Sequence, residues 1–246
     1  MANPPFNQKD WRAENELKDD PRWKGYDVPP KSNANYAWIL NMVSKLSENG
    51  VAGFILANGA LSGGGEEYKI RRKLIENNMV EAILVLPQDM FYTTNISVTV
   101  WILNKNKKEQ SRSIGDEIRL YRNREKEVLF MDLRQMGEPF EKKYTQFSDA
   151  DIKKIANTYH TWQCNNNKYE NIPEYCYSAT FDEIAKKDFS LVPSKYIEFI
   201  NRDENIDFDE KMQTLQSEFA ELLKAEEQSK KDLLNVFKEL GYEIKL

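Results

Sequence analysis

Asn3-Pro4-Pro5-Phe6 is the segment whose residue types and order fit a specific chemical task. Methylation of a planar exocyclic amine requires that the nitrogen lone pair be freed from conjugation with the ring. The Asn3 side-chain oxygen and the Pro4 carbonyl can each accept one N–H of such an amine and stabilise its developing charge. The prolines fix the carbonyl direction, and Phe6 offers a ring face to a base rotated out of a duplex. The alternative is a proline-rich turn without this role.

Other residue types that carry chemistry are sparse. Cys164 and Cys176 are too few for a disulfide framework and have no zinc spacing, so we predict two reduced thiols and no metal site. His160 has no Ser or Cys nucleophile motif nearby, and we interpret it as structural. A direct attack by the amine, without a covalent enzyme intermediate, agrees with this lack of a nucleophile.

The charge balance argues against autonomous binding of DNA. The chain has 35 Lys and Arg against 40 Asp and Glu, a net charge of −5, whereas a protein that binds DNA phosphates alone is usually basic. A basic cluster could contact phosphates, but we interpret it as solvated surface because Glu residues interrupt it. This cluster comprises Lys105, Lys107, Lys108, Arg112, Arg119, Arg122 and Arg124.

The apolar segments are those of a globular protein. The longest, 51–57 and 82–87, are far too short to cross a bilayer. The sequence does not begin with a basic stretch followed by an apolar run and a cleavage site. We therefore predict a cytoplasmic protein with no membrane partner.

Hydrophobic periodicity predicts alternating helices and strands. Helical spacing covers 36–46 and 66–77, whereas 51–56, 79–86 and 97–103 form apolar or β-branched runs. This order indicates an α/β fold with a mainly parallel sheet. The last two strands lack room for a crossover helix, so we predict that they pair antiparallel at the sheet edge.

The remaining segments are predicted in less detail. Residues 7–32 are predicted to be a long functional loop rather than packed structure, and 104–117 a charged linker. A strand at 127–132, a Ser-capped helix at 148–159, a polar loop at 163–175 and a short helix at 180–187 follow.

The last part of the chain differs in kind. Apolar residues recur there at steps of three and four, when Glu226 and Ser229 are counted in register. The pattern predicts either a helix that pairs with a helix of another chain or one that folds back on its own domain. We therefore divide the chain into 1–200 and a helical tail, 201–246. The seam comprises Met212, Leu215, Phe219, Leu222, Leu233, Val236 and Leu240.

A glycine-rich segment, Ser62-Gly63-Gly64-Gly65, follows a predicted strand and opens a helix. Backbone N–H groups in such a position can bind an anion. The segment lacks the Lys-Ser/Thr of a phosphate loop and the Gly-x-Gly-x-x-Gly pattern, and Glu66 and Glu67 would repel a phosphate. We interpret it as a turn that caps the helix.

The stretch from Asn3 to about Glu198 resembles the modification subunit of type I restriction-modification systems, which are N6-adenine DNA methylases with an Asn-Pro-Pro-Phe motif. The resemblance covers about four fifths of the chain. It is carried by that motif and by Asn35-Tyr36-Ala37-Trp38-Ile39, Gly53-Phe54-Ile55-Leu56-Ala57-Asn58-Gly59, Arg71-Arg72-Lys73-Leu74-Ile75, Leu86-Pro87 and Met90-Phe91-Tyr92-Thr93-Thr94-Asn95-Ile96.

The resemblance implies a fold and a site. It implies the C-terminal half of a Rossmann-like class I methyltransferase sheet, followed by the helical tail. It assigns binding of the target amine to Asn3, Pro4, Pro5 and Phe6. Phe91 and Tyr92 match the family's second target-base segment, although Phe91 could equally be an aromatic plug that closes the strand ends.

The resemblance also implies cofactor and partners. Family members carry a Gly-rich S-adenosylmethionine loop and an acidic ribose-binding residue upstream of the motif, whereas two residues precede Asn3 here. We therefore expect a C-terminal piece that binds no cofactor and does not methylate DNA alone. The expected partners are the specificity and restriction subunits, with DNA in the assembled complex. A non-catalytic assembly module and, less well supported, an RNA or protein methylase remain alternatives.

Overall fold

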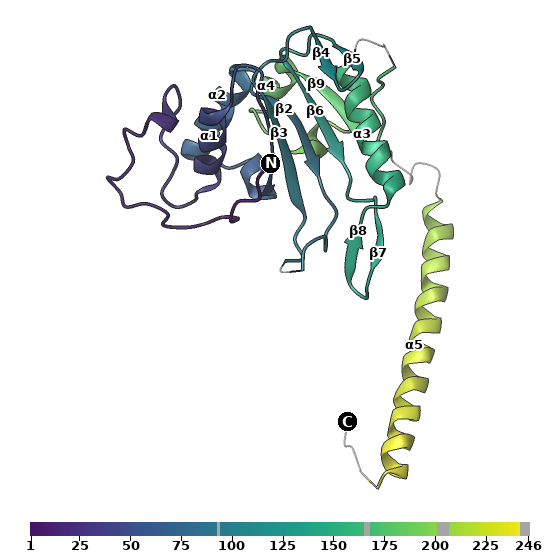
Figure 1. Ribbon diagram of the computed structural model, residues 1–246. Coiled ribbons are helices and arrows are strands. Elements are labelled where there is room, and N and C mark those ends of the chain that lie inside the picture. The colour runs from purple at the N-terminus through teal and green to yellow at the C-terminus, as the bar shows by residue number, and fades with distance from the viewer. Residues whose placement is uncertain (93, 165–167, 201–206, 242–246) are drawn as a thin grey trace. The chain divides into compact units, whose positions relative to one another are not determined.

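The computed structural model describes residues 1–92, 94–164, 168–200 and 207–241 (Figure 1). The chain divides into two compact units, Met1–Phe199 and Ile200–Leu246, which are described separately below.

The first unit is built on a five-stranded mixed sheet. Its strand order is β1-β3-β2-β6-β9. β3 is antiparallel to both β1 and β2, so β1 and β2 run in the same direction, and β6 is parallel to β2. β9 closes the sheet antiparallel to β6. The bounds are Val51–Ala57 (β1), Val80–Val85 (β2), Val98–Asn104 (β3), Glu127–Asp132 (β6) and Cys176–Thr180 (β9).

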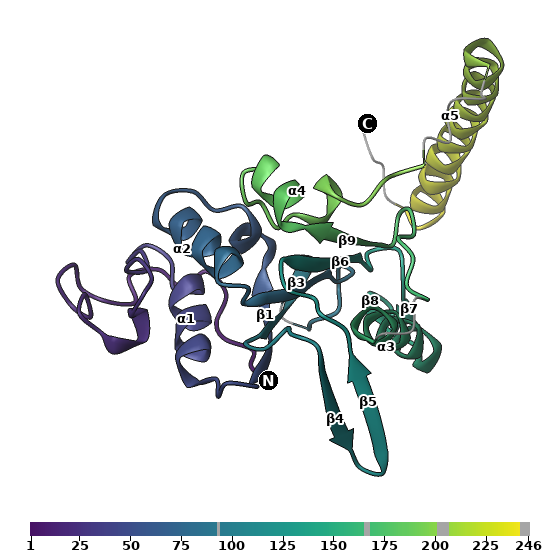
Figure 2. The same ribbon diagram turned by 90° about the horizontal axis from the view of Figure 1, so that it is seen from above.

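Three helices cover one face of this sheet (Figure 2). They are α1 (Asn35–Lys45), α2 (Gly65–Glu76) and α4 (Phe181–Lys186), and they bury Ile39, Leu40, Ile70, Leu74 and Ile184 against alternate strand residues. The central side chain of this layer is Trp101, which stacks on Phe54 and meets Tyr36 edge-on. The period-2 alternation of the strands therefore decides which side chains enter this core.

Helix α3 (Asp149–Gln163) lies on the opposite face. Its Trp162 is fully buried with Leu84, Leu129 and Met131 in a second apolar cluster. The predicted Ser cap is confirmed, since the Ser148 side chain accepts the Asp151 N–H within a capping box.

The prediction of an α/β fold with an antiparallel strand pair is confirmed, but the sheet is mixed rather than mainly parallel, since β2–β6 is the one parallel pairing among its four described strand pairings. The position of the predicted antiparallel pair also differs from the expectation. β2 and β3 lie inside the sheet, and β1 and β9 form its edges. The sequence order could not show that β3 inserts between β1 and β2, because the hydrophobic pattern of a strand does not indicate which strands it pairs with.

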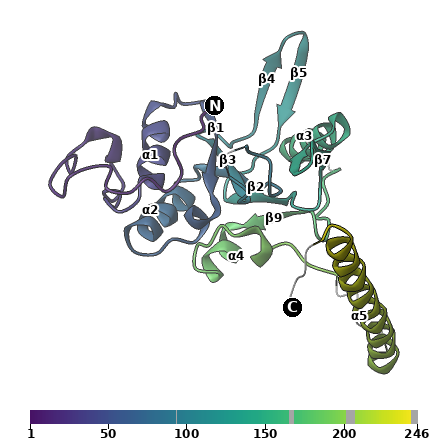
Figure 3. The ribbon, with the colours of Figure 1, turned by 90° about the horizontal axis from the view of Figure 1, so that it is seen from below.

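Two hairpins were not predicted. The segment expected to be a linker forms β4 (Gln110–Ile114) and β5 (Glu117–Tyr121), joined through Gly115-Asp116 with Gly115 at φ +59°. This hairpin extends away from the sheet (Figure 3). A shorter hairpin pairs β7 (Glu138–Phe140) with β8 (Tyr144–Gln146).

The expectation that 7–32 is unpacked loop is wrong. Trp23, at the end of the short helix η1 (Pro21–Trp23), is 3% exposed within the first core cluster. Its indole N–H donates to the Leu17 carbonyl at 2.7 Å, and Trp11 meets it edge-on. Although the segment is irregular, two large apolar rings bind it to the domain.

The interpretation of the basic cluster as solvated surface is wrong for two residues. Lys107 and Arg124 are 3% and 1% exposed. The Arg124 Nε donates to Glu81 Oε1 at 3.0 Å, and Glu81 is fully buried at an irregularity of β2. The extra residue of such a bulge can turn a polar side chain inward, and here that side chain is a carboxylate.

The second unit contains helix α5 (Phe208–Glu239), which buries none of its side chains. Asp207 caps it by accepting the N–H groups of Asp209 and Glu210. Its apolar seam is exposed, with Phe219 63%, Leu222 67% and Leu233 53% accessible. Among the residues the structure describes, no helix is both long and apolar enough to span a bilayer.

Candidate functional site

The Asn3–Phe6 segment starts from an anchor on the sheet. The Ala2 N–H donates to the Gly53 carbonyl at 3.0 Å, and the Ile55 N–H donates to the Ala2 carbonyl at 3.2 Å. Ala2 thereby forms a parallel bridge with Phe54 on the outer edge of β1. Because the bridge is parallel, the residues that follow Ala2 run toward the carboxyl end of β1.

A second anchor holds the chain just beyond Phe6. The Asn7 N–H donates to Asn35 Oδ1 at 3.0 Å, and Asn35 Nδ2 donates to Asn7 Oδ1 at 2.9 Å. Asn7 has φ +51°, in the left-handed region that asparagine tolerates. The four motif residues thus lie between two fixed points on β1 and α1.

Both proposed acceptors of the amine lack a hydrogen-bond partner among the residues that the structure describes. The Asn3 side chain is exposed. Within the described residues, neither its amide nor the Pro4 carbonyl takes part in a hydrogen bond. Phe6 is half-buried and packs against the second apolar cluster, beside Ile55. The arrangement leaves two acceptors and the edge of an aromatic residue available to a ligand.

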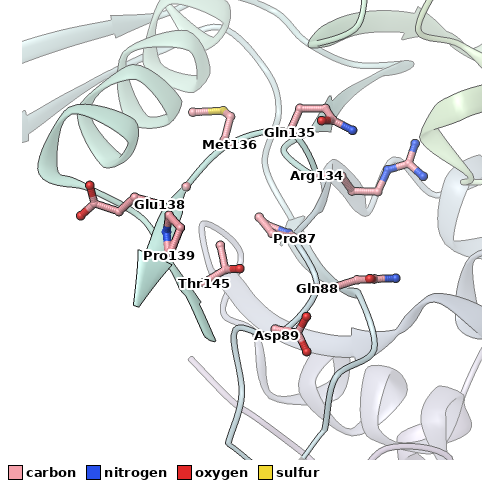
Figure 4. A pocket seen from close by; sticks show the side chains of 10 residues that line it. Pro87, Gln88, Asp89, Arg134, Gln135, Met136, Glu138, Pro139 and Thr145 are labelled. Atoms are coloured by element: carbon pink, nitrogen blue, oxygen red, sulfur yellow. The ribbon is translucent and has the colours of Figure 1, made fainter. Parts of the chain in front are cut away.

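The carboxyl ends of β1, β2 and β6 meet at one edge of the sheet, where α/β proteins bind ligands. A cavity of about 500 Å³ lies there between the loop after β2, the loop after β6 and the β7–β8 hairpin (Figure 4). A neighbouring cavity of about 340 Å³ shares Arg134 with it and reaches Asn58 and Ser62. The edge is therefore concave and polar over several loops.

Phe91 and Tyr92 occupy the same region in different ways. Phe91 is half-buried and packs on the apolar cluster that Phe6 also contacts. Tyr92 is 69% exposed, meets Tyr144 edge-on at 4.7 Å and lines a cavity of about 370 Å³ with Asp89 and Lys143. Phe6 and Phe91 thus pack against the same apolar cluster. In the described part of the chain, the cavities along this edge are lined by residues other than Asn3–Phe6.

The glycine-rich segment 62–65 is a poor fit to S-adenosylmethionine. This cofactor has no phosphate, and the negative group that it could place at a helix start is its carboxylate. The Glu67 carboxylate lies so close to Gly63 that a Cβ at that position would overlap it. The Gly63 carbonyl accepts from Arg71 Nη1 at 2.7 Å. Burial raises the pKa of the Glu67 carboxyl group. This carboxyl group lies in the first turn of α2. Glu67 and Arg71 thus already contact Gly63 from within the chain.

Two polar residues at the site were missed by the sequence analysis. Asp132 is the last residue of β6 and Arg134 lies two positions later; the Arg134 guanidinium binds the Asp132 carboxylate through Nε at 2.9 Å and Nη2 at 2.6 Å. This hydrogen bonding to Asp132 raises the pKa of Arg134. Their position just past a parallel strand was a usable signal, because such positions face the ligand-binding edge.

The likeness to known proteins agrees with this geometry. The family described as N-6 DNA Methylase matches residues 1–205. The chain therefore belongs to the N-6 DNA methylase family, and its resemblance to type I modification subunits is confirmed. It is 40% identical to the type I restriction enzyme HindI methylase subunit of Haemophilus influenzae over 99% of this chain and 51% of that protein. It is 33% identical to the MjaIX methylase subunit of Methanocaldococcus jannaschii over 98% of this chain and 42% of that protein.

A solved structure supports the fold assignment. The type I restriction-modification system methyltransferase subunit from Streptococcus thermophilus superposes with a TM-score of 0.67 at 30% identity. The match covers 80% of this chain and 37% of that one. The Rossmann-like methyltransferase class is thus confirmed. This chain spans about half the length of the HindI relative and less of the others.

Proposed function

We propose that this chain forms the target-base half of a type I DNA methyltransferase that methylates adenine N6. The observation that carries the proposal is the pair of unpartnered acceptors, Asn3 Oδ1 and the Pro4 carbonyl, held between anchors on β1 and α1. In this proposal residues 1–200 belong to the catalytic domain. The protein acts in the cytoplasm with specificity and restriction subunits and with DNA.

The role of the motif follows from its geometry. The two acceptors would each take one N–H of the adenine amine, which keeps the nitrogen lone pair out of the ring system and directs it outward. Phe6, and Phe91 from the loop after β2, would contact the faces of the extruded base. When bound, S-adenosylmethionine would supply a sulfonium methyl group: the N–C bond would form as the S–C bond breaks, the sulfur would leave as a neutral thioether, and the displaced N6 proton would pass to water.

We further propose that this chain does not methylate DNA alone. The glycine-rich segment at the start of α2 already contacts Glu67 and Arg71, which supports the proposal that another part of the methylase binds the cofactor. Calorimetric titration of the chain with S-adenosylmethionine is expected to show no binding. One-to-one binding of the cofactor would overturn this part of the proposal.

The target-amine role is tested in a chimeric methylase, made by joining this chain to the portion of the HindI methylase subunit outside the matched segment. The chimera is assayed with the HindI specificity subunit for methyl transfer to DNA. Substitution Asn3→Ala removes one acceptor and is expected to lower kcat by about 100- to 1000-fold. Affinity for S-adenosylmethionine should stay at the parental value.

The matched control is Asn49→Ala, which also removes an exposed asparagine amide. Asn49 precedes the amino end of β1, and its Oδ1 accepts from Asn106 Nδ2 at 2.7 Å. Its kcat should equal that of the parent chimera. A chimera that binds cofactor and DNA yet keeps parental kcat after Asn3→Ala would refute the clamp.

A second function, as an assembly module, is supported by α5. A 32-residue helix with an exposed three-four apolar seam and no buried side chain of its own is typical of a helix that pairs with another helix. We propose that it binds helices of a specificity subunit. Removal of residues 205–246 should abolish co-purification of the chimera with that subunit. Undiminished co-purification would exclude this role.

A further inference from the structure

Asn35 connects the Asn3–Phe6 segment to the start of α1. It is 1% exposed and lies 28 positions from Asn7 in the sequence. Its Oδ1 accepts the Asn7 N–H at 3.0 Å while its Nδ2 donates to Asn7 Oδ1 at 2.9 Å. One buried side chain therefore fixes both the backbone and the side chain of the residue that follows Phe6.

Neighbouring contacts make Asn35 itself rigid. Its backbone N–H donates to Asn33 Oδ1 at 2.9 Å, which satisfies one of the free N–H groups at the start of α1. Gln8, the residue after Asn7, is held too, because its carbonyl accepts the Ala34 N–H at 2.9 Å. The pair is thus part of a small network in which each buried amide group of Asn35 is satisfied.

The physical need for such a device lies in the motif. An amine clamp works only if its two acceptors are fixed before the ligand arrives, since each would otherwise lose entropy on binding. Pro4 and Pro5 restrict two φ angles, but they do not set the direction in which the segment leaves Ala2. A second fixed point beyond Phe6 sets that direction, and Asn7 makes its left-handed turn, at φ +51°, where Asn35 holds it.

We propose that Asn35 is a positioning residue for the amine clamp: its reciprocal pair with Asn7 holds Asn3 Oδ1 and the Pro4 carbonyl in the orientation that receives the target amine. Asn35 does not touch the base. The inference rests on the proposed function, and it adds a residue that acts through Asn7 on the four motif residues.

The chimeric methylase provides the test, with three variants that separate positioning from folding. Asn35→Ala removes both hydrogen bonds. Asn35→Asp keeps the acceptor for the Asn7 N–H and the side-chain shape, but it places an oxygen against Asn7 Oδ1. Asn7→Asp retains the acceptor that Asn35 Nδ2 uses and is the conservative rescue variant. Asn49→Ala is the matched control, because it breaks a side-chain amide pair far from the motif.

Four quantities are measured for each variant: kcat, KM for DNA, affinity for S-adenosylmethionine, and emission of 2-aminopurine placed at the target adenine, which reports extrusion of the base. We expect Asn35→Ala and Asn35→Asp to lower kcat by about 10- to 100-fold, the loss typical of a small misplacement of reacting groups. KM, cofactor affinity and the emission change should remain at parental values. Asn49→Ala should leave all four unchanged, and Asn7→Asp, which keeps the acceptor that Asn35 Nδ2 uses, should retain more of the parental kcat than either Asn35 variant.

Hydrogen exchange on this chain gives an independent measurement. The Asn7 amide is expected to be protected in the parent and in Asn49→Ala, and to exchange freely in Asn35→Ala while the β1 amides stay protected. Parental kcat in Asn35→Ala despite a freely exchanging Asn7 amide would overturn the inference. A fall in kcat that is matched by falls in cofactor affinity and β1 protection would also overturn it, since that is a general loss of folding.

The two proposals fail differently. If Asn3→Ala retains parental kcat, the clamp itself is refuted and the role of Asn35 falls with it. If Asn3→Ala is inactive while both Asn35 variants keep parental kcat, the clamp stands and only the positioning role is lost.

Discussion

Glu81, Arg124 and Lys107 place three ionisable groups inside the first unit, where water does not compensate them. Glu81 Oε1 accepts from Arg124 Nε at 3.0 Å and from Gln163 Nε2 at 3.1 Å. Lys107 Nζ donates to the Val80 carbonyl at 2.9 Å and to the Glu127 carbonyl at 2.6 Å. These contacts join the base of the β4–β5 hairpin to β2, β6 and α3. Removing one member of the Glu81–Arg124 ion pair should lower the free energy of unfolding more than replacing both members by apolar residues.

The substitution Arg124→Met tests this at the ion pair. It leaves the Glu81 carboxylate buried with Gln163 as its remaining donor, and we expect the free energy of unfolding to fall by about 3–5 kcal/mol. The double variant Glu81→Leu with Arg124→Met should regain most of that loss, because no carboxylate stays buried without its guanidinium partner. Urea unfolding of the parent, single and double variants measures the difference. A double variant as unstable as the single one would contradict the argument.

Lys107 should make stability depend on pH in the alkaline range. Burial lowers the pKa of Lys107 from 10.5 to about 8. Below pH 8 the folded and unfolded chains both carry the proton, and the cost of the buried charge is fully present. Between pH 8 and 10.5 the unfolded chain binds more protons, so the contribution of Lys107 to stability rises with pH.

The comparison variant is Lys107→Met, which has no proton to lose. Between pH 7 and pH 10 the unfolding free energy of the parent should gain about 2–3 kcal/mol relative to this variant. Urea unfolding at intervals of one pH unit measures the gain. Parallel pH profiles for the two proteins would show that the amine of Lys107 titrates normally.

At the scale of the element, the irregular segment before α1 depends on its tryptophans. Trp23 fills a position in the first core cluster and donates one hydrogen bond from its ring. Trp23→Ala should reduce the free energy of unfolding by about 3–5 kcal/mol, the usual cost of emptying a buried tryptophan site. Trp38→Ala, at a half-buried position on α1, is the comparison. Equal small losses in both variants would show that 7–32 does not belong to the core.

The regular elements near the motif could be predicted because their signals are local. The apolar runs of β1 and β2 and the spacing of α1 and α2 are visible in short windows of sequence. The place of β3 between β1 and β2 is set by pairing across as many as 53 positions, from Val51 to Asn104, and no short window of sequence contains that information. The β4–β5 hairpin was missed because β4 is mostly polar, although the alternation of Ile118 and Leu120 with charged residues in β5 was a usable strand signal.

Some residues of the candidate site could be predicted from local sequence, whereas others depend on tertiary packing. Asn3-Pro4-Pro5-Phe6 is contiguous, so its chemistry could be predicted from residue types alone. Asn35 could not, since its partner Asn7 is distant in sequence and the pairing depends on how α1 packs. Likewise, nothing in the spacing of charges distinguished the buried Lys107 and Arg124 from their exposed neighbours; that difference arises only when the hairpin folds against β2 and β6.

At the scale of the whole molecule, the two units should be independent in stability. Met1–Phe199 has two apolar clusters of its own, and α5 contributes no buried residue. Removal of residues 205–246 should therefore leave the melting temperature of the first unit unchanged while helicity decreases. Circular dichroism and differential scanning calorimetry measure both. A fall of several degrees would show that the first unit needs α5.

Because Ala2 is bridged to Phe54, the number of residues between Ala2 and Asn3 decides on which side of the chain the Asn3 side chain lies. Successive residues of an extended chain alternate sides, at about 3.3 Å each. One residue inserted after Ala2 would advance Asn3 by that step and turn it over, although every amino acid of the motif would be retained. Insertion of two residues would restore the side but lengthen the reach to Asn7. The number of residues between the bridge and the amide that receives the amine is thus as much a determinant of the chemistry as their identity.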